Sequence, residues 1–333
     1  MRNLARTLLN PLRQQGFREN VIYPAGREAQ RTLTRVLSTS RRLRRAASIV
    51  ADGLSVALAE APDMYGASYF GVERGGERRS GYAQYDRHTS RANIAAWLLW
   101  KNFEFRTSLD VGCALGFVVE ALRELGVEAR GSDISADAIS LANPSVRGFL
   151  SQGDLSQGLA FEDGQFDLVS AFEILEHLPP ERVPQALREL ARISRGYVLV
   201  TIPSFGPNPH GHVGWFNGKV RWSRLDHYVS LGTGYEGPVP FYDLMKDADG
   251  SPIEGHLTIA SFRWWTRQFQ AAGFLHAPDI EAAIYPDLRR LGLLGFWDLY
   301  VFRKPEVSGS PARRAPAELA ALEQRWSIER SGG

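Results

Sequence analysis

Apolar residues in the middle of the chain recur in two patterns that follow one another in turn. Short apolar runs bounded by glycine or acidic residues predict strands, and segments with apolar residues three or four positions apart predict helices. Strands are expected at 108–112, 128–133, 146–150, 166–172, 197–202 and 296–302, and helices at 92–101, 117–125, 136–142, 181–193 and 261–272. This alternation predicts a doubly wound α/β fold, with a mostly parallel sheet and helices on both faces.

The first 60 residues differ from the rest in charge. Positions 1–45 hold eleven arginines and two acids, a balance of +9, whereas the whole chain carries +2. The plain interpretation is a helical surface segment with solvated arginines, and contact with anionic lipid or nucleic acid is the alternative. No apolar run reaches the ~18 residues of a membrane span. With one cysteine, Cys113, and no secretory segment, a cytoplasmic protein without transmembrane segments is expected.

Two further segments interrupt the alternation of strands and helices. Residues 203–258 are rich in proline, glycine, histidine and aromatic residues and show no period, which predicts a lid insertion on the acceptor side. Residues 306–333 form a proline-containing tail with a short helix from Glu318. The central domain is therefore expected at 61–305, after the basic segment 1–60.

A tight turn after the first strand carries the most informative pattern. The acid Asp110 precedes Gly112, Ala114 and Gly116, and glycine lets the backbone approach a ligand closely. In open α/β sheets, ligands bind at this edge of the strands. A dinucleotide site would need a third glycine where Phe117 stands. The acid also suits a cofactor with a cationic end.

Together with three later features, this turn resembles motif I of the class I S-adenosylmethionine (SAM)-dependent methyltransferases. Residues 167–173 are similar to the fourth-strand motif of that family, and the resemblance covers about residues 65–305. It implies a seven-stranded Rossmann-like sheet with SAM as cofactor, Asp133 on the ribose hydroxyls and Asp154 by the adenine amine. The other cofactor contacts that it implies are Asp110, Gly112, Ala114, Gly116, Ile134, Leu155 and Phe172. Alanine at 114, where glycine is usual, is expected to tighten cofactor packing without abolishing binding.

Candidate catalytic residues follow the fourth strand. Glu173, Glu176 and His177 share one face if the chain turns helically there. His177, with an ordinary pKa near ~6.5, suits the removal of a proton from an acceptor hydroxyl. A role in packing alone is the plain alternative for all three side chains.

The same run of Glu-x-x-Glu-His resembles a metal-binding motif of the small-RNA 2′-O-methyltransferases and some quinone-pathway enzymes. That resemblance implies a divalent metal held by Glu173, Glu176, His177 and a downstream histidine. His212 is the first choice for the downstream ligand, and the alternatives are His210, His227 and His256. Mixed oxygen and nitrogen ligands suit Mg²⁺, Mn²⁺ or Zn²⁺.

The insertion at 203–258 mixes aromatic and polar residues, which fits a polyhydroxylated or aromatic small molecule. The segment from Gly255 to Phe274 resembles bacterial methyltransferases of glycan and natural-product pathways. The expected activity is methyl transfer from SAM to an oxygen of a sugar, glycan or secondary metabolite. An RNA methyltransferase is an alternative, although the balance of about −7 after residue 45 disfavours a phosphate track. A non-catalytic SAM-binding partner subunit is the other alternative.

Overall fold

The structure is a computed structural model that describes residues 65, 86–208, 210, 235–244, 252–294, 297–307 and 314–328. The expectations for the basic segment 1–60 and for most of the insertion, His212 and His227 included, lie outside these residues.

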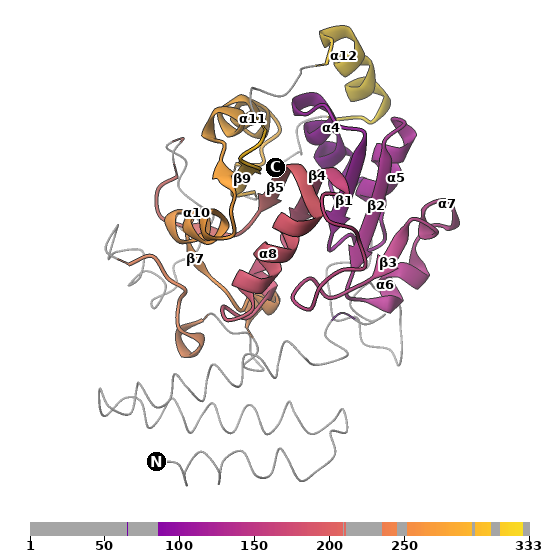
Figure 1. The fold of residues 1–333 in the computed structure, drawn as a ribbon. Coiled ribbons are helices and arrows are strands. Elements are labelled where there is room, and N and C mark those ends of the chain that lie inside the picture. Colours follow the sequence, from indigo (N-terminus) through magenta and orange to yellow (C-terminus); the bar gives the residue numbers. More distant parts are fainter. Residues whose placement is uncertain are drawn as a thin grey trace, which may run out of the picture.

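The elements follow the expected alternation (Figure 1). The strands are β1 Thr107–Val111, β2 Glu128–Asp133, β3 Leu150–Gln152, β4 Phe166–Phe172, β5 Ser194–Thr201, β6 Ser204–Phe205, β7 Ala260–Ser261, β8 Leu275–His276 and β9 Leu299–Arg303. The α-helices are α4 Ala92–Asn102, α5 Phe117–Glu124, α6 Ala136–Leu141, α7 Pro144–Arg147, α8 Val183–Ile193, α10 Phe262–Ala271, α11 Pro278–Arg290 and α12 Pro316–Arg325. Short 3₁₀ turns lie at Leu175–His177, Phe241–Asp243 and Ile253–Gly255.

The main sheet has seven strands in the order β3-β2-β1-β4-β5-β9-β8. The pairs from β3 to β5 are parallel, and β9 runs antiparallel to β5 and to β8. The expected seven-stranded, mostly parallel Rossmann-like fold is therefore confirmed. The order reverses direction between β1 and β4, which is where open α/β sheets place their ligands.

Helices cover both faces of this sheet, so its central strands are buried on both sides. Leu168 of β4 packs into a core with α4, α5 and α11, and the next residue, Val169, packs into a second core with α8 and α10. Successive side chains of a strand point to opposite faces, and for this reason β4 is apolar without interruption.

The region before β3 differs from the expected strand at 146–150. Residues 144–147 form α7, because Pro144 stands in its first turn and the Asn143 side chain accepts a hydrogen bond from the Ser145 N–H at 3.2 Å. The strand begins only at Leu150. Helix α11 and strand β8 were also absent from the sequence-based expectation.

Helix α12, in the segment expected as a tail, packs against α4 (Figure 1). Leu322 and Trp326 join the same core as α4, and the Arg87 guanidinium lies 5.2 Å from the centre of the Trp326 ring. The Asn93 amide donates to the Trp326 carbonyl at 3.4 Å. The last described helix therefore supports the helix that leads into the sheet.

Candidate functional site

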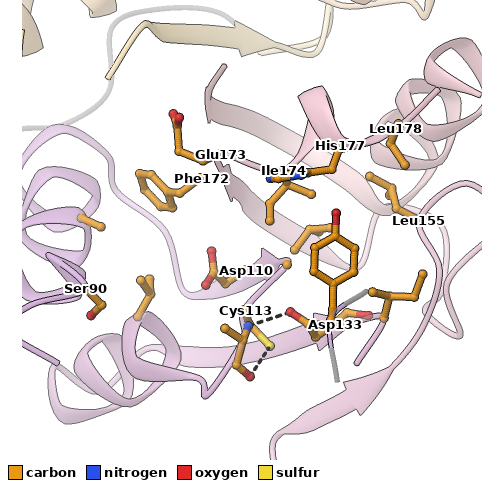
Figure 2. Close-up of a pocket in the computed structure, with 18 of the residues that line it drawn as sticks. Ser90, Asp110, Cys113, Asp133, Leu155, Phe172, Glu173, Ile174, His177 and Leu178 are labelled. Atoms are coloured by element: carbon orange, nitrogen blue, oxygen red, sulfur yellow. Dashed lines mark hydrogen bonds between the residues drawn. The ribbon is translucent and has the colours of Figure 1, made fainter. Parts of the chain in front are cut away.

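A cavity of about 480 Å³ opens at the carboxyl ends of β1, β2 and β4 (Figure 2). Residues from four parts of the chain form its walls: the start of α4, the β1–α5 turn, the ends of β2 and β3, and the segment after β4. Its lining includes most of the residues singled out in the sequence: Asp110, Gly112, Ala114, Asp133, Ile134, Asp154, Leu155, Phe172, Glu173 and His177.

The β1–α5 turn is shaped by three residues with left-handed backbone. Gly112, Ala114 and Gly116 have φ angles of 72°, 46° and 77°. A Cβ atom on Gly112 would lie 2.0 Å from Cδ1 of Ile174, so glycine is required there for both backbone and space. Gly116 does not line the cavity; its missing side chain leaves room for Leu150 behind the turn.

Asp133, at the end of β2, holds this turn in place. One carboxylate oxygen accepts the Ala114 N–H at 2.7 Å (Figure 2), and the other accepts the Ser135 N–H at 2.8 Å. These donors favour the ionised form, although burial is the larger effect and raises the pKa of Asp133. The bond also supports the left-handed Ala114, which is uncommon for a residue with a side chain.

Asp110 lies on the neighbouring strand with a single donor. Its Oδ1 atom accepts the Ser170 hydroxyl at 2.7 Å, and the residue is 5% exposed. Burial raises the pKa of Asp110 to about 7, and the nearby Asp133 carboxylate adds to this rise. Asp133 and Asp110 therefore differ in their hydrogen-bond donors: two backbone N–H groups for Asp133 and one hydroxyl for Asp110.

The far wall of the cavity combines apolar surface with a third acid. Ile134 is 46% exposed, which leaves an apolar face for a flat ring to pack on. Asp154 accepts hydrogen bonds from the N–H and the hydroxyl of Ser156 at 2.8 and 2.7 Å. Phe172 packs against Trp297, with 5.5 Å between the ring centres. These positions agree with the implied adenine and methionine ends but do not test them.

The segment after β4 is not the expected helix. Residues Leu175–His177 form a 3₁₀ turn, and Glu173 has a left-handed backbone with φ of 55°. Glu173 and His177 line the cavity, whereas Glu176 is fully buried and is not part of its lining. The helical turn that would bring all three side chains to one face is therefore not formed.

Glu176 instead faces two imidazole rings. Its Oε1 atom lies 4.0 Å from Nε2 of His177 and 3.9 Å from Nε2 of His256. The three ligand atoms lie within 4.8 Å of one another, and neither carboxylate oxygen of Glu176 has a hydrogen-bond partner. Burial raises the pKa of Glu176 well above its usual range and lowers that of His177 to about 4. An unpartnered buried carboxyl between neutral imidazoles has the donor set of a divalent metal site.

Backbone hydrogen bonds to Glu176 hold His256 beside it, although His256 comes 80 residues later in the chain. The N–H groups of Leu257 and Thr258 donate to the Glu176 carbonyl at 2.7 and 2.9 Å. His256 was one of four candidates for the downstream ligand. Another, His210, lies elsewhere and contacts Glu281 at 2.8 Å.

Part of the cavity wall was not anticipated. Arg91, at the start of α4, lines the cavity with Thr89 and Ser90, and Arg182 lines it near Asp154. No sequence motif marks these positions, because they reach the site only through the packing of α4 against the sheet. Among the described helices, none is long and apolar enough to cross a membrane.

One known family matches the first five strands of the main sheet. The family model described as a methyltransferase domain matches residues 109–200. This match runs from β1 to β5 and includes Asp110, Asp133 and the segment from Glu173 to His177. Residues 109–200 are therefore similar to a methyltransferase domain.

Curated relatives share part of this region. The ubiquinone biosynthesis O-methyltransferase of Methylococcus capsulatus is 37% identical over 93 residues, 26% of this chain and 39% of that protein. The magnesium-protoporphyrin O-methyltransferase of Synechocystis is 27% identical over 124 residues, 36% of this chain and 53% of that protein. The chain thus spans about two fifths to one half of the length of these relatives.

Solved structures with a similar fold include a SAM-dependent methyltransferase from Archaeoglobus fulgidus, at 16% identity and a TM-score of 0.41 over 66% of this chain and 96% of that chain. The magnesium protoporphyrin IX methyltransferase of Synechocystis with bound SAH has 16% identity and a TM-score of 0.39, covering 69% of this chain and 90% of that chain.

Proposed function

We propose that this protein transfers a methyl group from SAM to an oxygen atom of a hydroxylated small molecule. The observation that carries the proposal is the joining of two sites in one cavity. The turn fixed by Asp133 forms one end, and the neutral imidazole of His177 forms the other. The two curated relatives described above are both named as O-methyltransferases, which supports oxygen as the acceptor atom.

SAM has groups that match the walls of this cavity. Its ribose hydroxyls fit beside Asp133, its adenine beside Ile134 and Asp154, and its cationic end beside Asp110. Each carboxylate can accept a hydrogen bond from the cofactor in addition to those already described, because a carboxylate oxygen has more than one lone pair. This placement directs the methyl group toward the segment after β4.

The chemical step is a displacement at carbon. The acceptor oxygen forms a bond to the methyl carbon while the carbon–sulfur bond breaks, and the electron pair of that bond remains on sulfur as the thioether of S-adenosylhomocysteine. The acceptor proton must leave in the same step or before it. Alignment of the two reacting groups supplies a large part of the acceleration.

We assign the removal of that proton to His177, which lines the cavity. Its Nδ1 atom lies 3.3 Å from the Gly255 carbonyl, which can only accept a hydrogen bond, so Nδ1 carries the hydrogen and Nε2 keeps its lone pair. Because burial lowers its pKa to about 4, the ring is neutral at pH 7 and can accept a proton. A weak base of this kind suits an acidic hydroxyl, such as a phenol, better than an aliphatic alcohol.

A divalent metal is a second candidate partner for the same lone pair. Glu176, His177 and His256 would hold it, and the unpartnered carboxylate of Glu176 fits such a ligand. When bound, the metal would lower the pKa of a coordinated acceptor hydroxyl. Glu173, also proposed as a ligand from the sequence, lies outside the group of three.

The experiment that tests the function uses the full chain and methyl-labelled SAM. Calorimetry first establishes SAM binding, and label transfer is then measured to phenols, sugars and RNA, each with and without EDTA. Transfer to a phenol or sugar is the expected result, and phenols should be the better acceptors. SAM binding without transfer to any hydroxylated small molecule, or transfer to RNA alone, would contradict the proposal.

A further inference from the structure

The two acids at the cofactor end occupy adjacent strands but are held by different groups. Asp133 accepts backbone N–H bonds on both oxygens, whereas Asp110 has the Ser170 hydroxyl on one oxygen. In the described part of the chain no cation lies within ion-pair distance of Asp110, although the carboxyl faces the cavity (Figure 2). A buried carboxylate without a positive partner is costly in its ionised form.

Resting on the proposed function, we infer that Asp110 is a proton-linked gate for the cofactor: it holds a proton in the empty cavity and releases it when the cationic end of SAM binds. SAM carries an ammonium and a sulfonium group, and either one beside Asp110 supplies the missing positive charge. The proton leaves to solvent, so the charge change at Asp110 is balanced by the arriving cation.

Asp110 suits this role better than its neighbour because the two acids cannot ionise with equal ease. The two N–H donors of Asp133 favour its ionised form, and a charge on Asp133 disfavours a second one at Asp110. The rise in the pKa of Asp110 to about 7, due first to burial, agrees with this division. Cofactor affinity therefore becomes pH-dependent near pH 7.

Other charged and titratable groups line the cavity from each of its walls. Glu173 is the strongest competitor, since burial raises its pKa to about 8 and it faces the same space from the end of β4. The remaining groups are Tyr65, Arg91 at the start of α4, Cys113 in the β1–α5 turn, Asp133 and Asp154 at the ends of β2 and after β3, and His177 and Arg182 beyond β4.

The test is calorimetry of SAM binding to the full-length protein between pH 5.5 and 7, in pairs of buffers with different ionisation enthalpies. The amino group of SAM stays protonated over this range, since α-amino groups titrate near ~8. We expect affinity to rise about tenfold across the range, with release of about half a proton per SAM at pH 7. Neutral 5′-methylthioadenosine, which lacks the charged end, should show neither effect.

Variants assign the proton to its residue. Asp110→Asn should remove both the pH dependence and the proton release, whereas Glu173→Gln should retain them. Ser170→Ala removes the hydroxyl that lowers the pKa of Asp110 and should move the midpoint of the affinity curve to higher pH. In wild type, SAM binding with no proton release, or equal release with methylthioadenosine, would overturn the inference. Absence of SAM binding in all buffers would instead overturn the proposed function.

Discussion

Asp133 and Glu176, two buried acids near opposite ends of the cavity, differ in their hydrogen-bond partners. At the cofactor end, Asp133 has an N–H donor for each oxygen, and both donors come from the turns that it helps to shape. At the other end, Glu176 is fully buried and neither of its oxygens has a partner. Asp133 therefore has its partners within the chain, whereas Glu176, like Asp110, has no cation beside it in the described residues.

This difference separates two ways of building a site. The cofactor end is made by local backbone geometry, so its shape is set when β1, β2 and their turns form. The opposite end joins Glu176 to His256 through contacts between distant segments. A buried polar group without a partner costs roughly 1–3 kcal/mol, and a bound ligand removes that cost. Stability is expected to respond to mutation at the first end, and ligand dependence at the second.

The largest expected effect lies at the end proposed for the chemistry, beside His177. His177→Ala should lower turnover by ~10²–10⁴-fold, because the acceptor loses either its base or a metal ligand. Affinity for SAM should change little, since the turn at β1 does not contact this ring. Label transfer to the best acceptor measures turnover, and calorimetry measures SAM affinity on the same preparation. Near-normal turnover in this variant would remove both roles from His177.

A second substitution tests the rigidity of the cofactor end. Gly112→Ala should destabilise the protein by roughly 2–4 kcal/mol, because the new methyl group meets Ile174 and the backbone is left-handed. Gly126→Ala is the matched control: its φ is also positive, at 82°, but no atom lies within 4 Å of an added Cβ. Urea unfolding of both variants separates steric overlap from backbone strain. Equal losses would show that Ile174 moves aside.

A smaller effect is expected from Asp133→Ala. The variant loses the acceptor for Ala114 and Ser135 and a proposed ribose contact, so SAM binding should weaken by roughly 1.5–3 kcal/mol. Glu128→Ala, at the other and exposed end of β2, is the control and should bind SAM as wild type does. Calorimetry at pH 7 compares the two. Unchanged affinity in Asp133→Ala would contradict the assignment of this acid to the cofactor.

The smallest effect concerns the metal candidate. With a divalent metal at about ten times its dissociation constant, wild-type stability should rise by ~1.4 kcal/mol, and EDTA should reverse the gain. Glu176→Gln should lose this response, because an amide is a poor ligand for the ion. Thermal unfolding with Mg²⁺, Mn²⁺ and Zn²⁺ in turn provides the measurement. A wild-type protein that ignores all three ions would leave His177 as a base without metal.

The same contrast explains what could be predicted from the sequence. The turn from Asp110 to Gly116 follows from local rules on glycine and strand ends, and the cavity forms where those rules place it. The expected strand at 146–150 failed for an equally local reason, since the Asn143–Pro144 cap starts a helix. The Asn143–Pro144 pair is a local helix-start signal, and it overrides the strand pattern of the apolar residues that follow it.

The chemistry end depends on contacts that no local pattern encodes. The helical face expected for Glu173, Glu176 and His177 is replaced by a left-handed residue and a 3₁₀ turn. The sequence offers four histidines as the downstream ligand and does not distinguish His256 among them. Its position depends on backbone hydrogen bonds from Leu257 and Thr258 to Glu176. Arg91 reaches the cavity only through the packing of α4.

The contact between α4 and α12 has a consequence for how the protein is made. More than 200 residues separate these helices, yet Trp326 covers the start of α4 and shares its core. At synthesis rates of ~5–20 residues per second, the part of α4 that packs on α12 waits on the order of ten seconds or longer for its cover. A nascent chain that has completed all seven strands, and ends before residue 314, has α4 packed on α5 and α11 but leaves this part open to chaperones.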